Sequence, residues 1–245
     1  PRARRLDAIA LDLTDLEPDT ATASLLAYLA GFRQSALGAF AEAGALYERA
    51  LAASKVAFGP ESVETSTVLH NHAYMYEFST EIAKARELYQ QALAMREKVL
   101  GENDPRVATT LNNLARVIRD MGELDTAKPM FERVLAIREK APELGPEAYP
   151  TLVTRHDLAF LHQLQKNLDT AGILYEQTLA ICERVHGPEH HLMPYLLTSY
   201  GFLLSTLKRN EEAERALRRA LAIDEKIYGD EHPRASSSRT ALAKH

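Results

Sequence analysis

The sequence predicts an all-α protein built as a stack of similar helical hairpins. A seven-residue phrase, first found at 46–52, returns at intervals of 42, 42, 44 and 42 residues. The later copies occupy 88–94, 130–136, 174–180 and 216–222. A period of this length is typical of repeat arrays, in which each unit buries its apolar face only against its neighbours. Polar glycine-containing turns between the copies, and small residues at fixed positions within them, point to the same architecture.

The clearest single unit runs from Pro105 to Glu139. Pro105 suits the first turn of a helix, where its missing N–H costs nothing. Apolar residues then recur at spacings of three and four, which predicts an amphipathic first helix. Gly122 is expected to end that helix, because glycine readily adopts a left-handed conformation. A second helix follows, with Phe131 and Val134 among its inward-facing residues.

Small residues mark the places where the paired helices should touch. One series lies on the first helices and a second on the second helices: Gly31, Ala73, Ala115, Ala159 and Gly201, and then Ala43, Ala85, Ala127, Ala171 and Ala213. A large side chain at these positions would separate the backbones, and such overpacking costs ~1–3 kcal/mol. A third series is interpreted as core packing beside them: Tyr47, Tyr89, Phe131, Tyr175 and Leu217.

The recurring turns divide the chain into helical hairpins. The predicted repeats are residues 20–57, 62–100, 104–140, 147–186 and 190–228, with half-repeats at 1–16 and 232–245. The linker at 141–146 is two residues longer than the others, which explains the 44-residue interval. A half-repeat at each end leads us to expect a piece of a longer protein; terminal helices that act as caps are the alternative.

Composition narrows the class of protein. The chain has 245 residues, of which 46% are apolar and 26% charged, and a net charge of −5. No apolar run is long enough to span a membrane, and the mild acidity argues against nucleic-acid binding. Cys182 is the only cysteine, which favours a reducing compartment. The opening residues lack a secretory signal pattern. We therefore expect a cytoplasmic protein that binds neither membranes nor nucleic acid.

The hairpin pattern resembles the tetratricopeptide (TPR) repeat, in the lengthened form found in kinesin light chain. The resemblance depends on Leu111–Ala115 (LNNLA), on the following Gly122 and Ala127, and on Ala94–Gly101 (AMREKVLG). It implies a right-handed superhelix, or α-solenoid, of about five complete helix-turn-helix repeats plus a half-repeat at each end. It also implies that the first helix of each pair lines a concave face.

That resemblance gives a candidate peptide-binding groove on the first helices. The expected groove residues are His70, Tyr74, Thr109, Asn112, Arg116, Arg119, His156, Phe160, Tyr195 and Phe202. The amide of Asn112 can bond a peptide backbone, and the guanidinium groups of Arg116 and Arg119 suit carboxylates. The aromatic members could bury partner side chains. A peptide or protein segment with an acidic residue near its centre is therefore the expected partner.

One alternative to ligand contact remains open for the groove arginines. The side chain of Arg116 or Arg119 could instead pair with Asp120 or Asp157. The carboxylate clamp of some TPR proteins uses lysines where this sequence has His70 and His156, which argues against a role as a chaperone adaptor.

Catalytic interpretations are not favoured. His70 and His72 are two residues apart, so on a helix they point about 200° apart and cannot share a metal ion. The group His186, His190 and His191 falls in a recurring turn, and a zinc site there is not expected. Cys182 has a histidine four residues further on, but no third group that would orient this pair for nucleophilic catalysis can be identified. We expect no enzyme activity and no cofactor.

The predicted function is a non-catalytic interaction scaffold that binds a peptide segment in its groove. One alternative is a sensor or autoinhibitory segment of a larger signalling enzyme. Another is a structural array that self-associates into a homo-oligomer through its exposed terminal half-repeats.

Overall fold

A computed structural model describes residues 21–79 and 81–245 of the chain, and within those ranges it contains helices and turns with no strand. The predicted half-repeat at 1–16 lies outside the described residues. The prediction of an all-α fold made of successive helical hairpins is confirmed for the described residues. The contacts divide the chain into two compact units, 1–123 and 124–245, which are described separately.

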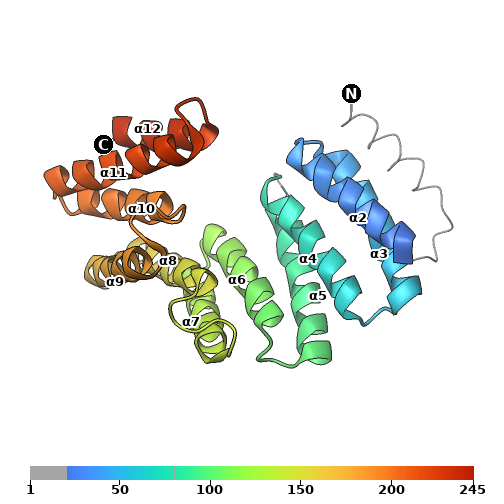
Figure 1. The fold of residues 1–245 in the computed structure, drawn as a ribbon. Helices are drawn as coiled ribbons and strands as arrows, with labels where there is room; N and C mark the ends of the chain where they lie inside the picture. Colours follow the sequence, from blue (N-terminus) through green and yellow to red (C-terminus); the bar gives the residue numbers. More distant parts are fainter. Residues whose placement is uncertain (1–20, 80) are drawn as a thin grey trace. The chain divides into compact units, whose positions relative to one another are not determined.

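The described part of the first unit consists of five helices (Figure 1). They are α2 (Ala21–Ala36), α3 (Phe40–Phe58), α4 (Val63–Glu77), α5 (Ile82–Leu100) and α6 (Pro105–Asp120). Each packs against the next along the chain, and the first helices α2, α4 and α6 also contact one another in order. The first helices therefore form one continuous layer of this unit.

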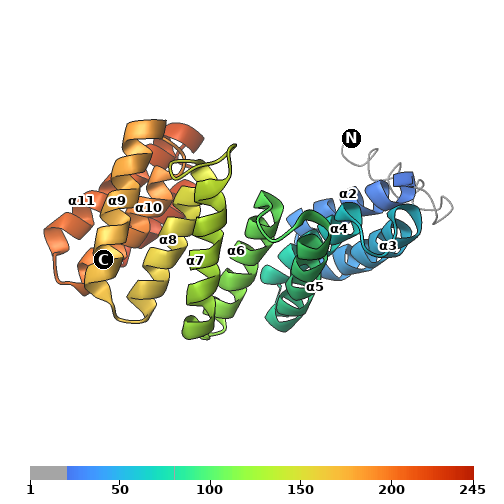
Figure 2. The same cartoon turned by 90° about the horizontal axis from the view of Figure 1, so that it is seen from below.

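The second unit contains six helices, shown from yellow-green to red in Figures 1 and 2. They are α7 (Leu124–Lys140), α8 (Tyr149–Leu164), α9 (Leu168–His186), α10 (Met193–Thr206), α11 (Asn210–Tyr228) and α12 (Pro233–Ala243). Here too each helix packs on the next, and α10 contacts both α8 and α12. The first helices α8, α10 and α12 make the corresponding layer.

Helix ends follow the turn chemistry expected from the sequence. Asp104 caps α6 by accepting a hydrogen bond from the backbone N–H of Arg106, and Pro105 occupies the first turn. Gly122 follows α6 with φ of 86°, as predicted for a left-handed residue. Lys166 and Lys208 occupy equivalent positions after α8 and α10 with φ of 66° and 63°, where a side chain brings strain.

The small-residue and aromatic series lie in the core as predicted. Every member of the alanine series is fully buried, and so are Tyr47, Tyr89, Phe131, Tyr175 and Leu217. Gly31 shows why size matters, since a Cβ atom there would lie 3.3 Å from the Tyr47 ring and 3.4 Å from the Ala43 carbonyl oxygen. Close backbone approach between α2 and α3 at Gly31 thus helps to fix the layer of first helices that carries the candidate groove.

Candidate functional site

The candidate groove residues of the first unit divide into exposed and buried ones. Tyr74 and Thr109 are exposed, and the side chain of Arg116 is one-third exposed. Asn112 and Arg119 are buried, with 3% and 8% of their surface accessible. A peptide bound to this face would therefore contact Tyr74, Thr109 and the exposed part of Arg116 before it contacted the two buried side chains.

His70 is engaged inside the layer of first helices. Its Nδ1 lies 3.2 Å from the Thr110 hydroxyl on α6, and its ring packs edge-on to Tyr89. Burial, together with the nearby Arg96 guanidinium, lowers the pKa of His70 to about 3. A neutral imidazole that links α4 to α6 is thus a structural contact between neighbouring repeats.

The two arginines of α6 have carboxylate partners within the first unit. Arg116 lies 3.6 Å from the Glu77 carboxylate, and the other oxygen of Glu77 accepts a hydrogen bond from the Tyr89 hydroxyl. Arg119 donates to Asp120 at 2.8 Å, one of the pairings considered from the sequence. Because both guanidinium groups are already close to carboxylates, their attraction for an acidic guest is reduced.

The second unit presents aromatic side chains on its first helices. Tyr195 and Phe202 on α10 are exposed by 48% and 38%, and Phe160 on α8 is half-buried. His156 is buried, places Nε2 2.8 Å from the Ser199 hydroxyl, and contacts Tyr195 in a tilted arrangement with ring centroids 4.1 Å apart. His156 therefore packs against the Tyr195 ring, which is itself partly exposed to solvent.

Two apolar cavities open between α2 and α4, and the sequence interpretation did not locate them. The larger, about 500 Å³, is lined by residues 21–28 of α2, by Phe58, and by the first turns of α4. The smaller, about 260 Å³, is lined by Phe32, Ser35 and Ala36 of α2 with Tyr47, Tyr74, Met75 and Phe78. The aromatic residues Phe32 and Phe78 were the signal for these cavities that the sequence offered. Their exposed rings line a cavity only because α2 packs on α4.

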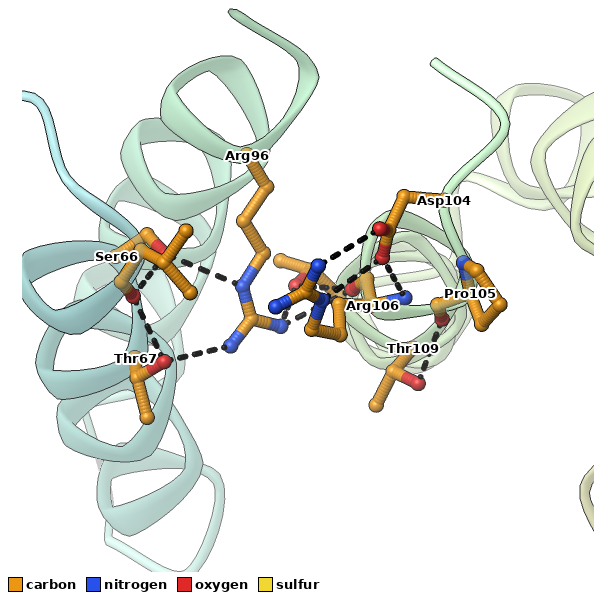
Figure 3. A network of polar contacts seen from close by, with 9 residues as sticks. Ser66, Thr67, Arg96, Asp104, Pro105, Arg106 and Thr109 are labelled. Atoms are coloured by element: carbon orange, nitrogen blue, oxygen red, sulfur yellow. Dashed lines mark hydrogen bonds and ion pairs between the residues drawn. The ribbon is translucent and has the colours of Figure 1, made fainter. Parts of the chain in front are cut away.

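Buried arginines link the repeats within each unit, which the sequence interpretation also missed. Arg96 on α5 donates to the Arg106 carbonyl at 3.0 Å and to the Thr110 hydroxyl at 2.6 Å, and its other nitrogens reach Ser66 and Thr67 (Figure 3). Arg138 donates to the Pro150 carbonyl in the same way at 2.6 Å. Burial lowers the pKa of each guanidinium to about 10, so both stay charged at neutral pH.

The histidine-rich turn before α10 forms a stack of rings. The ring centroids of His186 and His190 lie 4.8 Å apart, and those of His190 and His191 lie 4.1 Å apart. The thiol of buried Cys182 lies 4.0 Å from His190, and burial raises its pKa to about 11, which disfavours the thiolate. Across residues 21–79 and 81–245, no group of three or more His, Cys, Asp or Glu side chains is placed to hold a metal ion.

A membrane-spanning segment was also sought among the described helices. None of them combines the length and the apolar character needed to cross a bilayer.

Comparisons with solved structures identify similar folds. A Podosopora anserina protein described as a kinesin light chain with nearly identical TPR-like repeats is 25% identical, with a TM-score of 0.68 over 87% of this chain and 99% of that one. BtubC (BKLC) from P. vanneervenii is 21% identical, with a TM-score of 0.74 over 95% and 91% of the two chains. No curated protein sequence gives a significant match.

A third similar structure is the Rap conjugation gene regulator of plasmid pLS20, solved in complex with the Phr* peptide. It is 16% identical, with a TM-score of 0.68 over 89% of this chain and 56% of the Rap chain. At this identity the likeness is one of fold.

The family comparison covers most of the chain. The tetratricopeptide repeat family matches residues 19–98, 64–140 and 150–226, which together include every hairpin from α2 to α11. The fold agrees with the kinesin-light-chain-like structures. The chain belongs to the tetratricopeptide repeat family, with repeats of the kinesin-light-chain-like type.

Proposed function

We propose that this protein is a non-catalytic interaction module that binds a segment of another protein on the exposed face of its first helices. One observation carries the proposal: large apolar side chains are exposed on these helices, and in the first unit they lie at two apolar cavities. Phe32 on α2 and Tyr74 on α4 belong to this face in the first unit, and Tyr195 and Phe202 on α10 in the second. Exposed clusters of this kind are typical of interaction surfaces.

The partner segment is expected to bind mainly through apolar contacts. Burying one large apolar side chain contributes roughly 1.5–3 kcal/mol, whereas a neutral hydrogen bond contributes about 0.5–1.5 kcal/mol net. A micromolar dissociation constant corresponds to about −8 kcal/mol. Three or four anchored side chains therefore suffice, and Arg116, already beside Glu77, adds a weaker preference for an acidic residue.

Two features fit this proposal. The Rap regulator, which shares the fold, was solved with a bound peptide, so a stack of this kind can accept one. The exposed side of α12 is polar, with Ser236, Ser237, Arg239 and Thr240 facing solvent, and it gives little apolar surface for self-association.

A library of random peptides displayed on phage and selected on the immobilised full chain tests the proposal. We expect enriched peptides whose affinity falls at least tenfold with Tyr195→Ala/Phe202→Ala or with Tyr74→Ala. The control is Ile173→Ala, which removes an apolar side chain with 56% exposure on a second helix, α9. If every selected peptide binds these variants as it binds the wild type, or binds only when Ile173 is intact, the proposed face is wrong.

A further inference from the structure

The α2–α4 groove, defined here as the two cavities between these helices with the surface that joins them, has a built-in spacing. The larger cavity is lined by residues 21–28 and 63–68, and the smaller by residues 32–36 and 74–78. The two linings are displaced by about ten residues along both helices, which is roughly 15 Å at ~1.5 Å per helical residue. An occupant that fills both must carry two anchors at about that separation.

Both cavities are apolar and open at the surface. Leu25 and Phe58 beside the larger one are exposed by 55% and 41%, and Phe32 and Phe78 beside the smaller one by 50% and 60%. Leu29, on the α2 surface between the two cavity linings, is exposed by 50%. Each cavity has room for a large side chain, and the surface between them has an apolar side chain in place.

Several polar groups in and beside the groove are already engaged within the protein. Thr67 donates its hydroxyl hydrogen to the Val63 carbonyl, and the Asn71 side-chain amide donates to the Thr67 carbonyl. Ser35 donates to the Gly31 carbonyl, while His70 is bonded to Thr110. An extended peptide needs partners for its backbone N–H and C=O groups, and this surface offers few. A helix satisfies its backbone internally.

Charge adds a further preference at the larger cavity. Glu64 lies on its rim, is exposed, and makes no hydrogen bond or ion pair within residues 21–79 and 81–245. A carboxylate in this position attracts a cationic side chain at the edge of an apolar contact. It therefore favours a lysine or arginine next to the anchor that enters this cavity.

We propose that the α2–α4 groove binds an amphipathic helix of a partner protein. Its two large apolar side chains lie ten or eleven residues apart, with a basic residue beside one of them. Three helical turns rise about 16 Å, so such side chains lie on one face at the spacing of the two cavities. The inference rests on the proposed function and specifies the chemistry of the partner in the first unit.

The test uses a phage library of alanine-rich 18-residue helices in which one face is randomised, selected on the full chain. We expect enriched helices with Leu, Met or an aromatic residue at two positions ten or eleven apart, and a basic residue near one of them. Leu25→Ser and Phe78→Ser change one exposed residue in each cavity and should each weaken binding at least tenfold. Glu64→Lys should weaken binding, and replacing the peptide's basic residue by Glu should restore it.

Matched variants separate the possible failures. Ile173→Ser on α9, outside the proposed face, should leave the affinity of these helices unchanged. Selected helices that bind Leu25→Ser and Phe78→Ser normally but lose affinity for Tyr195→Ala overturn this inference and leave the proposed function standing. If the only enriched peptides are extended, contain proline and require Leu25 for binding, the groove does not bind a helix and the inference is wrong. Failure of both the helical and the random libraries to yield any binder overturns the inference and the proposed function together.

Discussion

At the residue scale, the histidines of α4 show how an apparent site can be part of the core. The His72 ring lies between those of Tyr47 and Tyr76, with centroid distances of 5.3 and 5.1 Å. Neither of its ring nitrogens has a hydrogen-bond partner among the described residues. Burial, reinforced by the positive charge of Lys84, lowers the pKa of His72 to about 4. The folded protein therefore holds this ring neutral at physiological pH.

Acid should destabilise the protein through His72. In the unfolded chain its pKa is about 6.5, so between that pH and about 4 the unfolded state binds a proton that the folded state does not. The stabilisation is complete above pH 6.5 and is lost as the pH falls toward 4, by roughly 2–3 kcal/mol. The substitution His72→Phe keeps a stacked ring and should remove this loss. Urea unfolding at pH 7 and pH 4.5 measures the difference.

The same substitution has a second expected effect at neutral pH. Phenylalanine leaves no unpartnered nitrogen in the core, so the free energy of unfolding should rise by about 1 kcal/mol. His70, whose pKa is also lowered, should keep some acid sensitivity in the variant. If the change in unfolding free energy between the two pH values equals that of the wild type, His72 does not contribute to acid unfolding.

Sequence periodicity predicted the core at residue level but not the access of solvent to the groove. Ala43, Ala85 and Tyr89 recur at fixed positions, and their burial follows from the pattern alone. The helical phase also puts Tyr74 and Asn112 on the face of the first helices. Helical phase does not tell which of these residues is covered, since Tyr74 is exposed and Asn112 is buried. For the same reason, the phase of α5 did not reveal that Arg96 is buried between repeats.

At the element scale, the contacts between successive repeats use matched residue pairs. One buried position on each second helix has a buried counterpart on the following first helix. The pairs are Ser54 and Val68, Arg96 and Thr110, Arg138 and Thr154, Cys182 and Leu196, and Asp224 and Ser238. Where the second helix carries a charge, the first helix supplies a hydroxyl within hydrogen-bond distance. Where the second helix carries a small uncharged residue, the first helix supplies an apolar one.

Exchanging one pair for another should preserve stability better than changing either residue alone. Arg96→Cys removes a guanidinium that fills the interface, together with its hydrogen bonds to the Arg106 carbonyl and the Thr110 hydroxyl, which costs roughly 2–4 kcal/mol. Thr110→Leu inserts a larger side chain beside buried Arg96 and removes the hydroxyl that bonds Arg96 and His70, which costs about 1–3 kcal/mol. The double variant reproduces the Cys182 and Leu196 pair. We expect a favourable coupling of about 1–3 kcal/mol in a double-mutant cycle followed by urea unfolding.

The equivalent cycle at a distance provides the control. Arg96→Cys combined with Leu196→Val joins sites on α5 and α10, which belong to different units, so the two effects should add. Additive costs in the Arg96 and Thr110 cycle as well would show that the pairing has no energetic basis.

At the scale of the whole molecule, the helices within each unit contact near neighbours along the chain. In the second unit α9 packs on α8 and α10, and α11 packs on α10 and α12. In such arrays stability is approximately a sum of repeat and nearest-neighbour terms. A destabilising substitution in one hairpin should therefore increase local unfolding of that hairpin and of those beside it, while distant hairpins stay folded.

Gly201 in α10 is a position at which the contacts made by a substituted side chain follow from the structure. A Cβ atom there would lie 2.9 Å from both Cγ and Cδ2 of fully buried Leu217, so the Leu217 side chain or one of the two helices must shift. We expect Gly201→Ala to cost about 1–3 kcal/mol. At Gly172 in α9 a Cβ atom would lie 3.7 Å from Leu203, an ordinary contact. Gly172→Ala should therefore stabilise its helix by about 0.5–1 kcal/mol.

Amide hydrogen exchange then locates the effect of each substitution along the chain. In Gly201→Ala, protection should fall in α10 and α11 and to a smaller extent in α9 and α12, whereas α2 to α5 should exchange as in the wild type. Gly172→Ala should not reduce protection in any described helix. The reason is that the strain enters through the contact between α10 and Leu217 on α11, and α10 packs on α8, α9, α11 and α12 of its own unit. An equal loss of protection in α2 to α5 would mean that the chain opens as one cooperative body, and the nearest-neighbour account of its stability would be wrong.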